Sequence, residues 1–190
     1  MRALHLKYKK VNLEAAEEID LIKRAVGNPE MFEPIYNKYF KQIYLYLFKR
    51  CADEMLAEDL TSQAFLKAMD KLHQYSDKGV PFSAWLYRIA HNELLLHFRH
   101  TKYTRAVHAK LQDVEILHDE IAEQELEKDR LATLKKALSS LSEDELSLVE
   151  MKYFEHRTYE EICDILDLTV SNAKVKMHRI MKKLNKLVQK

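Results

Sequence analysis

Apolar residues recur every three or four positions over most of the chain, a spacing that places them on one face of successive helices. The clearest stripe predicts a well-buried helix over about residues 31–50. A second helix is expected after Asp53, which has the side chain of an N-cap, and reaches about Leu72. Residues 73–81 are expected to form a loop, and Phe82 then opens a third helix. The first half of the chain therefore predicts a helical bundle.

The second half shows shorter periodic segments with two helix-start signals. Ser142 and Thr158 are each followed three residues later by Glu, which is the pattern of a capping box. The second box predicts a short helix over residues 159–166, a turn at 167–169 and a long helix from Val170. This order of elements is the layout of a helix-turn-helix, in which the second helix enters the major groove of DNA.

Composition favours an all-α fold. Two glycines and three prolines in 190 residues leave few turn formers, which argues against a β-sandwich, a barrel or a glycine-cradled nucleotide fold. This length suits one ordinary domain or two small ones. The charged fraction of 32% and the lack of a long apolar run predict no membrane insertion. The first ten residues lack the apolar stretch of a secretion signal, and the two isolated cysteines fit a reducing environment, so a cytoplasmic location is expected.

The formal net charge of +1 conceals two strongly charged segments. Residues 113–129 carry eight acids and one base, a net of −7, whereas residues 170–190 carry seven bases and no acid, a net of +7. The acidic stretch is only weakly periodic, so residues 104–130 are expected to be a linker or an exposed helix. The predicted fold is thus two small helical domains, residues 1–103 and 131–190, joined by an acidic linker.

The long C-terminal helix carries residue types that read DNA. A helical projection gathers its apolar residues on one face and most of its bases on the other. Arg or Lys donates to guanine, Asn pairs with adenine, and later lysines suit phosphates. The alternative is a solvated basic face at a helix C-terminus. The residues expected to read base edges or contact DNA in the first turns are Ser171, Asn172, Lys174, Lys176 and Arg179.

The segment around Trp85 combines aromatic and basic residues on one predicted helix. Aromatic rings stack on unpaired bases, and basic side chains neutralise the nucleic-acid backbone. Four residues of the preceding loop, Tyr75, Ser76, Asp77 and Lys78, have side chains suited to holding a flipped base. Because aromatic residues at helical spacing are more often core, Trp85 and Leu86 are themselves expected to be core residues, and the alternative for the loop is a plain surface turn.

Three stretches of the chain resemble a known family. Residues 57–68 (AEDLTSQAFLKA) and 82–92 (FSAWLYRIAHN) are similar to regions 2.2 and 2.3–2.4 of bacterial sigma-70 factors, specifically the extracytoplasmic-function (ECF) class. Residues 159–166 (YEEICDIL) and the helix that follows are similar to region 4 of the same class. The resemblance covers roughly residues 30–100 and 131–188.

The resemblance implies a specificity subunit of RNA polymerase, with core polymerase and promoter DNA as partners, no cofactor, and an anti-sigma partner as in many ECF factors. By position it assigns the polymerase interface to Asp59, Leu60, Gln63, Phe65 and Leu66. It assigns melting and capture of the minus-ten element to Tyr75, Ser76, Asp77, Lys78, Arg88, Asn92 and Arg99. Reading of the minus-thirty-five element falls to the outward residues of the C-terminal helix, and the acidic linker matches the connector between the two domains.

The chain departs from the family at Asp167, where the turn usually carries Gly, and at Lys176, which cannot form a planar fork on guanine.

Two other classes of protein are alternatives to this interpretation, a metal-dependent enzyme and a stand-alone DNA-binding regulator. A di-iron bundle needs two Glu-x-x-His pairs, but only Glu115 and His118 fit, and neither Cys51 nor Cys163 has a partner at zinc-ligand spacing. We therefore expect no metal and no enzymatic activity. A stand-alone helix-turn-helix regulator would use the C-terminal half alone, leaving the pattern over residues 57–99 unexplained.

Overall fold

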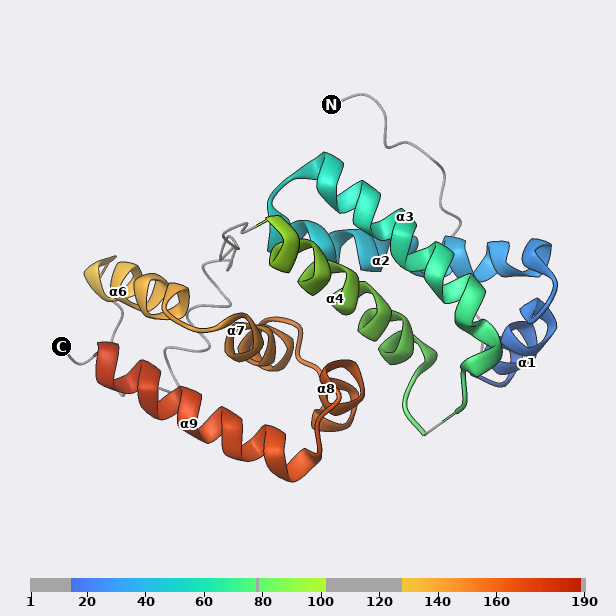
Figure 1. Cartoon of the computed structure of the whole chain (residues 1–190). Helices are drawn as coiled ribbons and strands as arrows, with labels where there is room; N and C mark the ends of the chain where they lie inside the picture. Colours follow the sequence, from blue (N-terminus) through green and yellow to red (C-terminus); the bar gives the residue numbers. More distant parts are fainter. Residues whose placement is uncertain (1–14, 78, 102–127, 189–190) are drawn as a thin grey trace. The chain divides into compact units, whose positions relative to one another are not determined.

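The computed structural model describes residues 15–77, 79–101 and 128–188, which fold into helices joined by short turns, with no strand among these residues (Figure 1). The chain divides into two compact units, Met1–Thr101 and Lys102–Lys190. The expectation of an all-α protein is confirmed. Within the described ranges, no helix is long and apolar enough to cross a bilayer.

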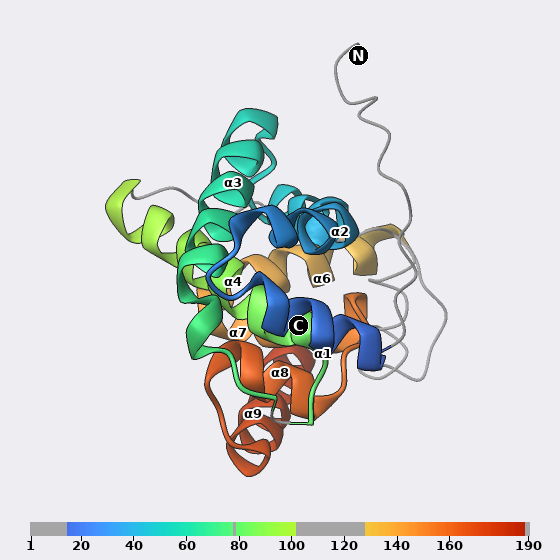
Figure 2. The ribbon, with the colours of Figure 1, turned by 90° about the vertical axis from the view of Figure 1, so that its right-hand side faces the viewer.

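The first unit is built around three long helices that pack on one another, as Figures 1 and 2 show. Its elements are α1 (Ala15–Ala25), the 3-10 turn η1 (Pro29–Phe32), α2 (Glu33–Cys51), α3 (Glu54–Lys71), the 3-10 turn η2 (Leu72–Gln74) and α4 (Phe82–Thr101). The core of the unit lies where α2, α3 and α4 meet. It is filled by Ile35, Ile43, Leu47, Leu60, Ala64, Leu86, Ala90 and Leu94.

The junction between α2 and α3 shows why these helices end and begin where they do. Ala52 takes the left-handed conformation (φ 55°) and ends α2, with its N–H donating to the carbonyl of Phe48. Asp53 then caps α3, because its Oδ1 accepts a hydrogen bond from the Leu56 N–H at 3.0 Å. The prediction that Asp53 is an N-cap is confirmed.

The structure of this unit differs from the sequence-based interpretation in three places. The loop predicted over residues 73–81 begins later, because His73 and Gln74 belong to the 3-10 turn that continues α3. Trp85 is half-buried rather than a full core residue, whereas Leu86 is completely buried. Helix α1 was not anticipated. It packs against η1 and buries Leu21 and Ile22, whose spacing with Ala25 is the helical signal that could have revealed it.

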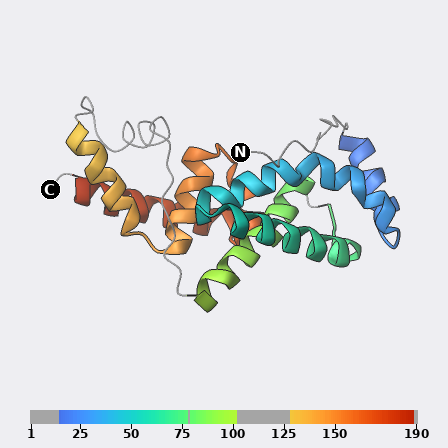
Figure 3. The same cartoon turned by 90° about the horizontal axis from the view of Figure 1, so that it is seen from above.

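The second unit is arranged around its last helix, which packs against three shorter elements and can be followed in Figure 3. The elements are α6 (Lys128–Ser139), α7 (Glu143–Val149), the π-helical turn η3 (Glu150–Phe154), α8 (Tyr159–Leu166) and α9 (Val170–Val188). Helix α6 begins three residues before the predicted domain boundary at residue 131. Most of the predicted linker, residues 104–127, lies outside the described residues.

Both predicted capping boxes are present. The Ser142 hydroxyl accepts from the Glu145 N–H at 3.3 Å, and the Glu145 carboxylate accepts from the Ser142 N–H at 2.9 Å. Thr158 and Glu161 make the same reciprocal pair at 3.2 and 2.9 Å. Asp167 ends α8 with φ 55°, so the turn of the helix-turn-helix uses the left-handed conformation at the position where the family usually has Gly.

Candidate nucleic-acid and protein interfaces

Helix α9 has one buried face and one exposed face. Ala173, Met177, Ile180 and Leu184 are buried against the rest of the second unit. The opposite side exposes Ser171, Asn172, Lys174, Val175, His178, Arg179, Lys182 and Lys186. Four of the five residues predicted to contact DNA are therefore exposed, while Lys176 lies half-buried at the edge of this face.

The start of α9 is fixed by a side-chain cap. The Thr169 hydroxyl accepts a hydrogen bond from the Asn172 N–H at 3.2 Å, so Thr169 satisfies one of the first free N–H groups of the helix. This cap orients the first turn, where Ser171 and Asn172 lie exposed.

One exposed residue of this face was missed by the sequence analysis. His178 lies between Lys174 and Lys182, one turn from each, and beside Arg179. Its ring nitrogens both donate and accept hydrogen bonds, so it has the chemistry to contact a base edge. The helical projection would have identified it, had histidine been counted with the basic residues.

A second basic feature joins α9 to the start of α8. The Tyr159 ring has the Nζ of Lys152 at 4.9 Å and the Nζ of Lys174 at 5.7 Å from its centroid. The two lysines come from η3 and α9, and the tyrosine is the first residue of α8. Two ammonium groups beside one ring extend the basic face beyond α9. Sequence reasoning could not group these three residues, because only the fold brings them together.

Lys183, one of the later lysines of α9, makes contacts within the second unit. Its Nζ donates to Glu145 Oε2 at 2.9 Å and to the Ser140 carbonyl at 3.3 Å, so it ties α9 to the start of α7. Burial raises the pKa of Glu145, but the hydrogen bonds from Lys183 and Ser142 and the charge of Lys183 outweigh it, and the net pKa lies below the ordinary value.

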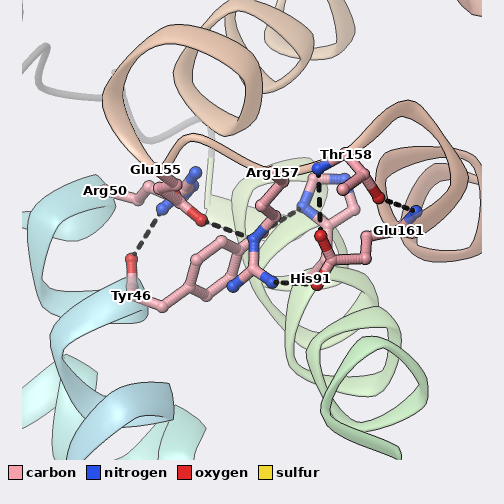
Figure 4. Close-up of polar contacts among 7 residues, drawn as sticks. All are labelled: Tyr46, Arg50, His91, Glu155, Arg157, Thr158 and Glu161. Atoms are coloured by element: carbon pink, nitrogen blue, oxygen red, sulfur yellow. Dashed lines mark hydrogen bonds and ion pairs between the residues drawn. The ribbon is translucent and has the colours of Figure 1, made fainter. Parts of the chain in front are cut away.

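A charged cluster holds the segment before α8 (Figure 4). Arg157 Nε lies 2.9 Å from Glu155 Oε2, and its Nη1 lies 3.8 Å from Glu161 Oε1. Glu161 also belongs to the capping box at Thr158. Because all these contacts lie at the start of α8, they fix the angle at which the helix-turn-helix begins.

In the first unit, the predicted DNA-contacting residues of α4 share one face. Arg88, Asn92 and Arg99 are four and seven residues apart, which places them in one row along the helix. Asn92 and Arg99 are exposed and Arg88 is half-buried. The carboxylate of Glu93 is buried beside this row and pairs with Lys67 Nζ of α3 at 2.5 Å.

The loop before α4 is anchored by an aromatic cluster, which we define as Tyr75, Phe82 and Trp85. The centroid of the Tyr75 ring lies 5.0 Å from that of Phe82 and 5.5 Å from that of Trp85. Phe82 and Trp85 are 5.4 Å apart. Phe82 is buried, whereas Tyr75 and Trp85 are half-exposed.

The polar residues of the same loop are at the surface. Ser76 and Asp77 are exposed, and Asp77 Oδ1 accepts from the Gly79 N–H at 2.8 Å, which closes a local turn. Lys78 lies outside the described residues.

The predicted polymerase interface on α3 is only partly at the surface. Asp59, Gln63 and Leu66 are exposed, and Leu66 keeps 63% of its accessible area. Gln63 Nε2 donates to Asp59 Oδ2 at 2.8 Å. Leu60 and Phe65 are buried in the core of the first unit, so their side chains are not offered to a partner. Met55, which is 82% exposed on the same helix, is an apolar surface residue that sequence reasoning missed.

A buried polar group links α2 to α4 (Figure 4). The Tyr46 hydroxyl lies 3.0 Å from His91 Nδ1. The Arg50 guanidinium lies 3.7 Å from the centroid of the Tyr46 ring, and its Nη1 donates to the Tyr46 carbonyl. These contacts fix the angle between two helices of the bundle. Nowhere in the described part of the chain do His, Cys, Asp and Glu side chains gather in the threes needed to hold a metal ion.

Two exposed surfaces, a basic helix-turn-helix and a helical bundle with an aromatic cluster, define a DNA-binding protein of two helical units. Residues 35–104 match the family described as Sigma-70 region 2, and residues 131–184 match Sigma-70, region 4. The chain therefore belongs to the sigma-70 family, in its ECF group, whose members direct RNA polymerase to promoters.

Similar proteins carry related names. The chain is 25% identical over 177 residues to the ECF RNA polymerase sigma factor BldN of Streptomyces coelicolor, which covers 92% of this chain and 67% of that protein. It is 28% identical over 163 residues to the RNA polymerase sigma factor YlaC of Bacillus subtilis, covering 85% and 94% of the two chains.

Two solved structures share the fold. One is CnrH in complex with the cytosolic domain of CnrY, with a TM-score of 0.56 and 20% identity, covering 90% of this chain and 96% of that chain. The other is the sigma factor RpoE in complex with the anti-sigma factor NepR from Bartonella quintana, with a TM-score of 0.53 and 20% identity, covering 83% and 96%.

Proposed function

We propose that this chain starts transcription by reading a minus-thirty-five element with α9 and by holding the melted minus-ten strand with α4 and the aromatic cluster. The observation that carries the proposal is the two-sided character of α9. Its buried residues are all apolar and pack in the core, and most of its polar and basic residues are exposed on the second helix of a helix-turn-helix.

Duplex reading would be divided along α9. The first turns expose Ser171, Asn172 and Arg179, whose side chains have the donors and acceptors needed at base edges. Val175 is apolar and suits a thymine methyl group. Lys182 and Lys186 lie farther along the same face and suit phosphates, which position the protein without reading sequence.

The pair of lysines beside Tyr159 would add a backbone contact. Lys152 and Lys174 bring two positive charges close to one ring at the start of α8. A DNA phosphate near this point would meet both ammonium groups and the tyrosine hydroxyl.

Strand capture would use the first unit. The half-exposed rings of Tyr75 and Trp85 offer stacking surfaces for unpaired bases. Arg88, Asn92 and Arg99 run along α4 from the cluster and are suited to following the sugar-phosphate backbone. Ser76 and Asp77 add hydrogen-bonding groups at the loop, and Lys78 belongs to the same proposal by sequence position.

Core polymerase would bind the exposed face of α3. Asp59 and Gln63 supply polar contacts, and Leu66 and Met55 supply apolar area that has no cover within the described part of the unit. An apolar patch with a polar rim is typical of a protein interface. Leu60 and Phe65 would support this surface from inside.

We also propose an anti-sigma partner, a cytoplasmic location and no enzymatic activity. The support for an anti-sigma partner is that two structures of the same fold hold RpoE with the anti-sigma factor NepR and CnrH with part of CnrY. An affinity-tagged chain isolated from its own cell lysate is expected to bring down polymerase subunits and one additional small protein.

The experiment that tests the proposal is transcription from a pool of randomised duplex templates with core polymerase, with and without the chain. Transcripts that depend on the chain and start downstream of two shared sequence elements would support it. Enrichment of one duplex sequence by the chain alone, with no dependent transcripts, would instead identify a stand-alone helix-turn-helix regulator. The chain alone is expected to bind duplex weakly, and more weakly as salt rises.

A further inference from the structure

Helix α1 is connected to the aromatic cluster by a short series of side-chain contacts. Glu18 of α1 lies next to Tyr39 of α2, and Tyr39 lies next to Phe82 at the start of α4. Phe82 contacts both half-exposed rings of the cluster. The residues that match Sigma-70 region 2 begin at residue 35, so α1 lies outside the matched part of the chain.

The first contact is strong and largely withdrawn from water. Glu18 Oε1 accepts hydrogen bonds from the Tyr39 hydroxyl and from Lys38 Nζ, both at 2.6 Å, and the Glu18 side chain is only 12% exposed. Hydrogen bonds to a charged acceptor are shorter and stronger than those between neutral groups. Burial raises the pKa of Tyr39, and the bond and charge of Glu18 raise it further, so the hydroxyl keeps its proton and donates.

The second contact, between the Tyr39 and Phe82 rings, connects the Glu18–Tyr39 hydrogen bond to the aromatic cluster. The centroids of the Tyr39 and Phe82 rings are 5.8 Å apart, and both side chains are buried. Phe82 is the first residue of α4 and sits between the loop and the helix. Because packed rings occupy defined positions, a rotation of Tyr39 displaces Phe82 and with it Tyr75 and Trp85.

We propose that Glu18 is a positioning residue for strand capture: by holding Tyr39 it fixes Phe82, and so it presents the Tyr75 and Trp85 rings to an unpaired base. The inference rests on the proposed function for the use of those two rings, but the positioning itself is a property of the chain alone. Lys38 neutralises the Glu18 carboxylate and lets it remain at this partly buried place.

The chain contains a single tryptophan, Trp85, so its fluorescence reports on the cluster alone. The test compares Glu18→Ala, which removes the acceptor, with Glu18→Gln, whose amide oxygen still accepts from Tyr39. The matched control is Asp20→Asn on the same helix, where Asp20 makes an exposed ion pair with Arg24. Each variant is first measured free, by the position of the Trp85 emission maximum.

The same variants are then assembled with core polymerase on a template selected by the wild-type chain. Opening is followed by a fluorescent base analogue in the minus-ten strand, and duplex binding and polymerase affinity are measured beside it. We expect Glu18→Ala to shift Trp85 emission to longer wavelength and to slow opening about tenfold, the size expected for loss of one charge-assisted hydrogen bond. Duplex binding and polymerase affinity should stay within about twofold of wild type, while Glu18→Gln and Asp20→Asn should open at close to the wild-type rate.

Wild-type emission and opening in Glu18→Ala would overturn the inference. An equal fall in opening, duplex binding and polymerase affinity would also overturn it, because that pattern indicates general loss of structure. If the wild-type chain opens no template, the proposed function fails, whereas unchanged Trp85 emission in Glu18→Ala would refute the positioning by itself.

Discussion

Three residues other than glycine adopt positive φ in the described chain: Ala52, His156 and Asp167. Asp167 is an example of a backbone conformation that the sequence can indicate. Its place after a short predicted helix, where the family usually has Gly, indicated a left-handed turn, and the structure has φ 55° there. Ala52 gave no such signal, because alanine has no preference for this conformation.

Ala52→Gly is expected to stabilise the first unit. An alanine in the left-handed conformation is strained by roughly 1–2 kcal/mol, and glycine removes the strain but adds freedom to the unfolded chain, so a net gain of about 0.5–1 kcal/mol follows. Chemical denaturation followed by Trp85 fluorescence measures it. Ser62→Gly, at an exposed position inside α3, is the control and should destabilise by a similar amount.

Arg179 and Lys186 are both exposed on α9, but different effects are expected from their removal. Arg179→Ala should weaken binding to the selected duplex by about 1–3 kcal/mol and relax preference at one base pair. Lys186→Ala should weaken binding to every duplex alike and lower the salt slope by about one unit. Binding titrations at several salt concentrations separate the two. If both variants lose affinity uniformly, the exposed face contacts phosphates alone.

At the scale of elements, contacts between residues close in sequence could be predicted from the sequence, whereas contacts between residues far apart in sequence could not. The capping boxes at Ser142 and Thr158 were found because both partners lie within three residues of each other. Leu60 and Phe65 lie at helical spacing with the other apolar residues of α3 and are buried, whereas their assignment to the polymerase interface came only from resemblance by position.

Lys183 shows the limit of a helical projection. The projection correctly separated the buried and exposed sides of α9, yet it contained no information about α7, which supplies Glu145 as the partner of this lysine. The contacts of Tyr159 with Lys152 and Lys174 were hidden for the same reason. Such contacts depend on how helices pack.

The link between α7 and α9 predicts a dependence of stability on pH. The pKa of Glu145 is lowered in the folded chain, so the folded state holds this proton less tightly than the unfolded state, where the ordinary value is 4.5. The contribution of Glu145 is therefore complete above about pH 4.5 and is lost as pH falls through the lower, folded value.

Glu145→Gln should reduce the free energy of unfolding at pH 7 by about 0.5–1 kcal/mol, as for a partly exposed ion pair. It should also flatten the decline of stability on the acid side of pH 4.5. Urea denaturation followed by circular dichroism between pH 3 and pH 7 measures both. Asp144→Asn, exposed in the same first turn, is the control, and an equal change in it would show that the effect belongs to the helix end rather than to the Lys183 contact.

At the scale of the whole molecule, each unit has a hydrophobic core of its own. Trp85 lies in the first unit, whereas the buried Leu184 lies in the second. Leu184→Ala should cost about 2–5 kcal/mol in the second core. Circular dichroism, which senses both units, should then show an early thermal transition, while the transition seen by Trp85 fluorescence should keep its midpoint. A parallel shift of both signals would contradict independent cores.

The charge of the whole molecule is also divided. The chain sums to +1, but its last segment carries a net of +7, and the described part of that segment forms α9. The net of −7 falls on residues 113–129, almost all of which lie outside the described residues. Near-neutrality of the total thus gave no indication of a nucleic-acid partner, whereas the charge by segment did.

The separation of a buried and an exposed face on α9 has a consequence for how such a protein evolves. Ala173, Met177, Ile180 and Leu184 are the buried residues by which this helix packs on its core, so exposed positions that make no contact with another element are free to vary with little effect on folding. For a chain proposed to read promoters with those positions, the promoter sequence that it prefers can change while the packing of its core stays the same. The same property makes α9 a convenient place to engineer new preferences, with a randomised library confined to Ser171, Val175, His178, Arg179 and Lys182.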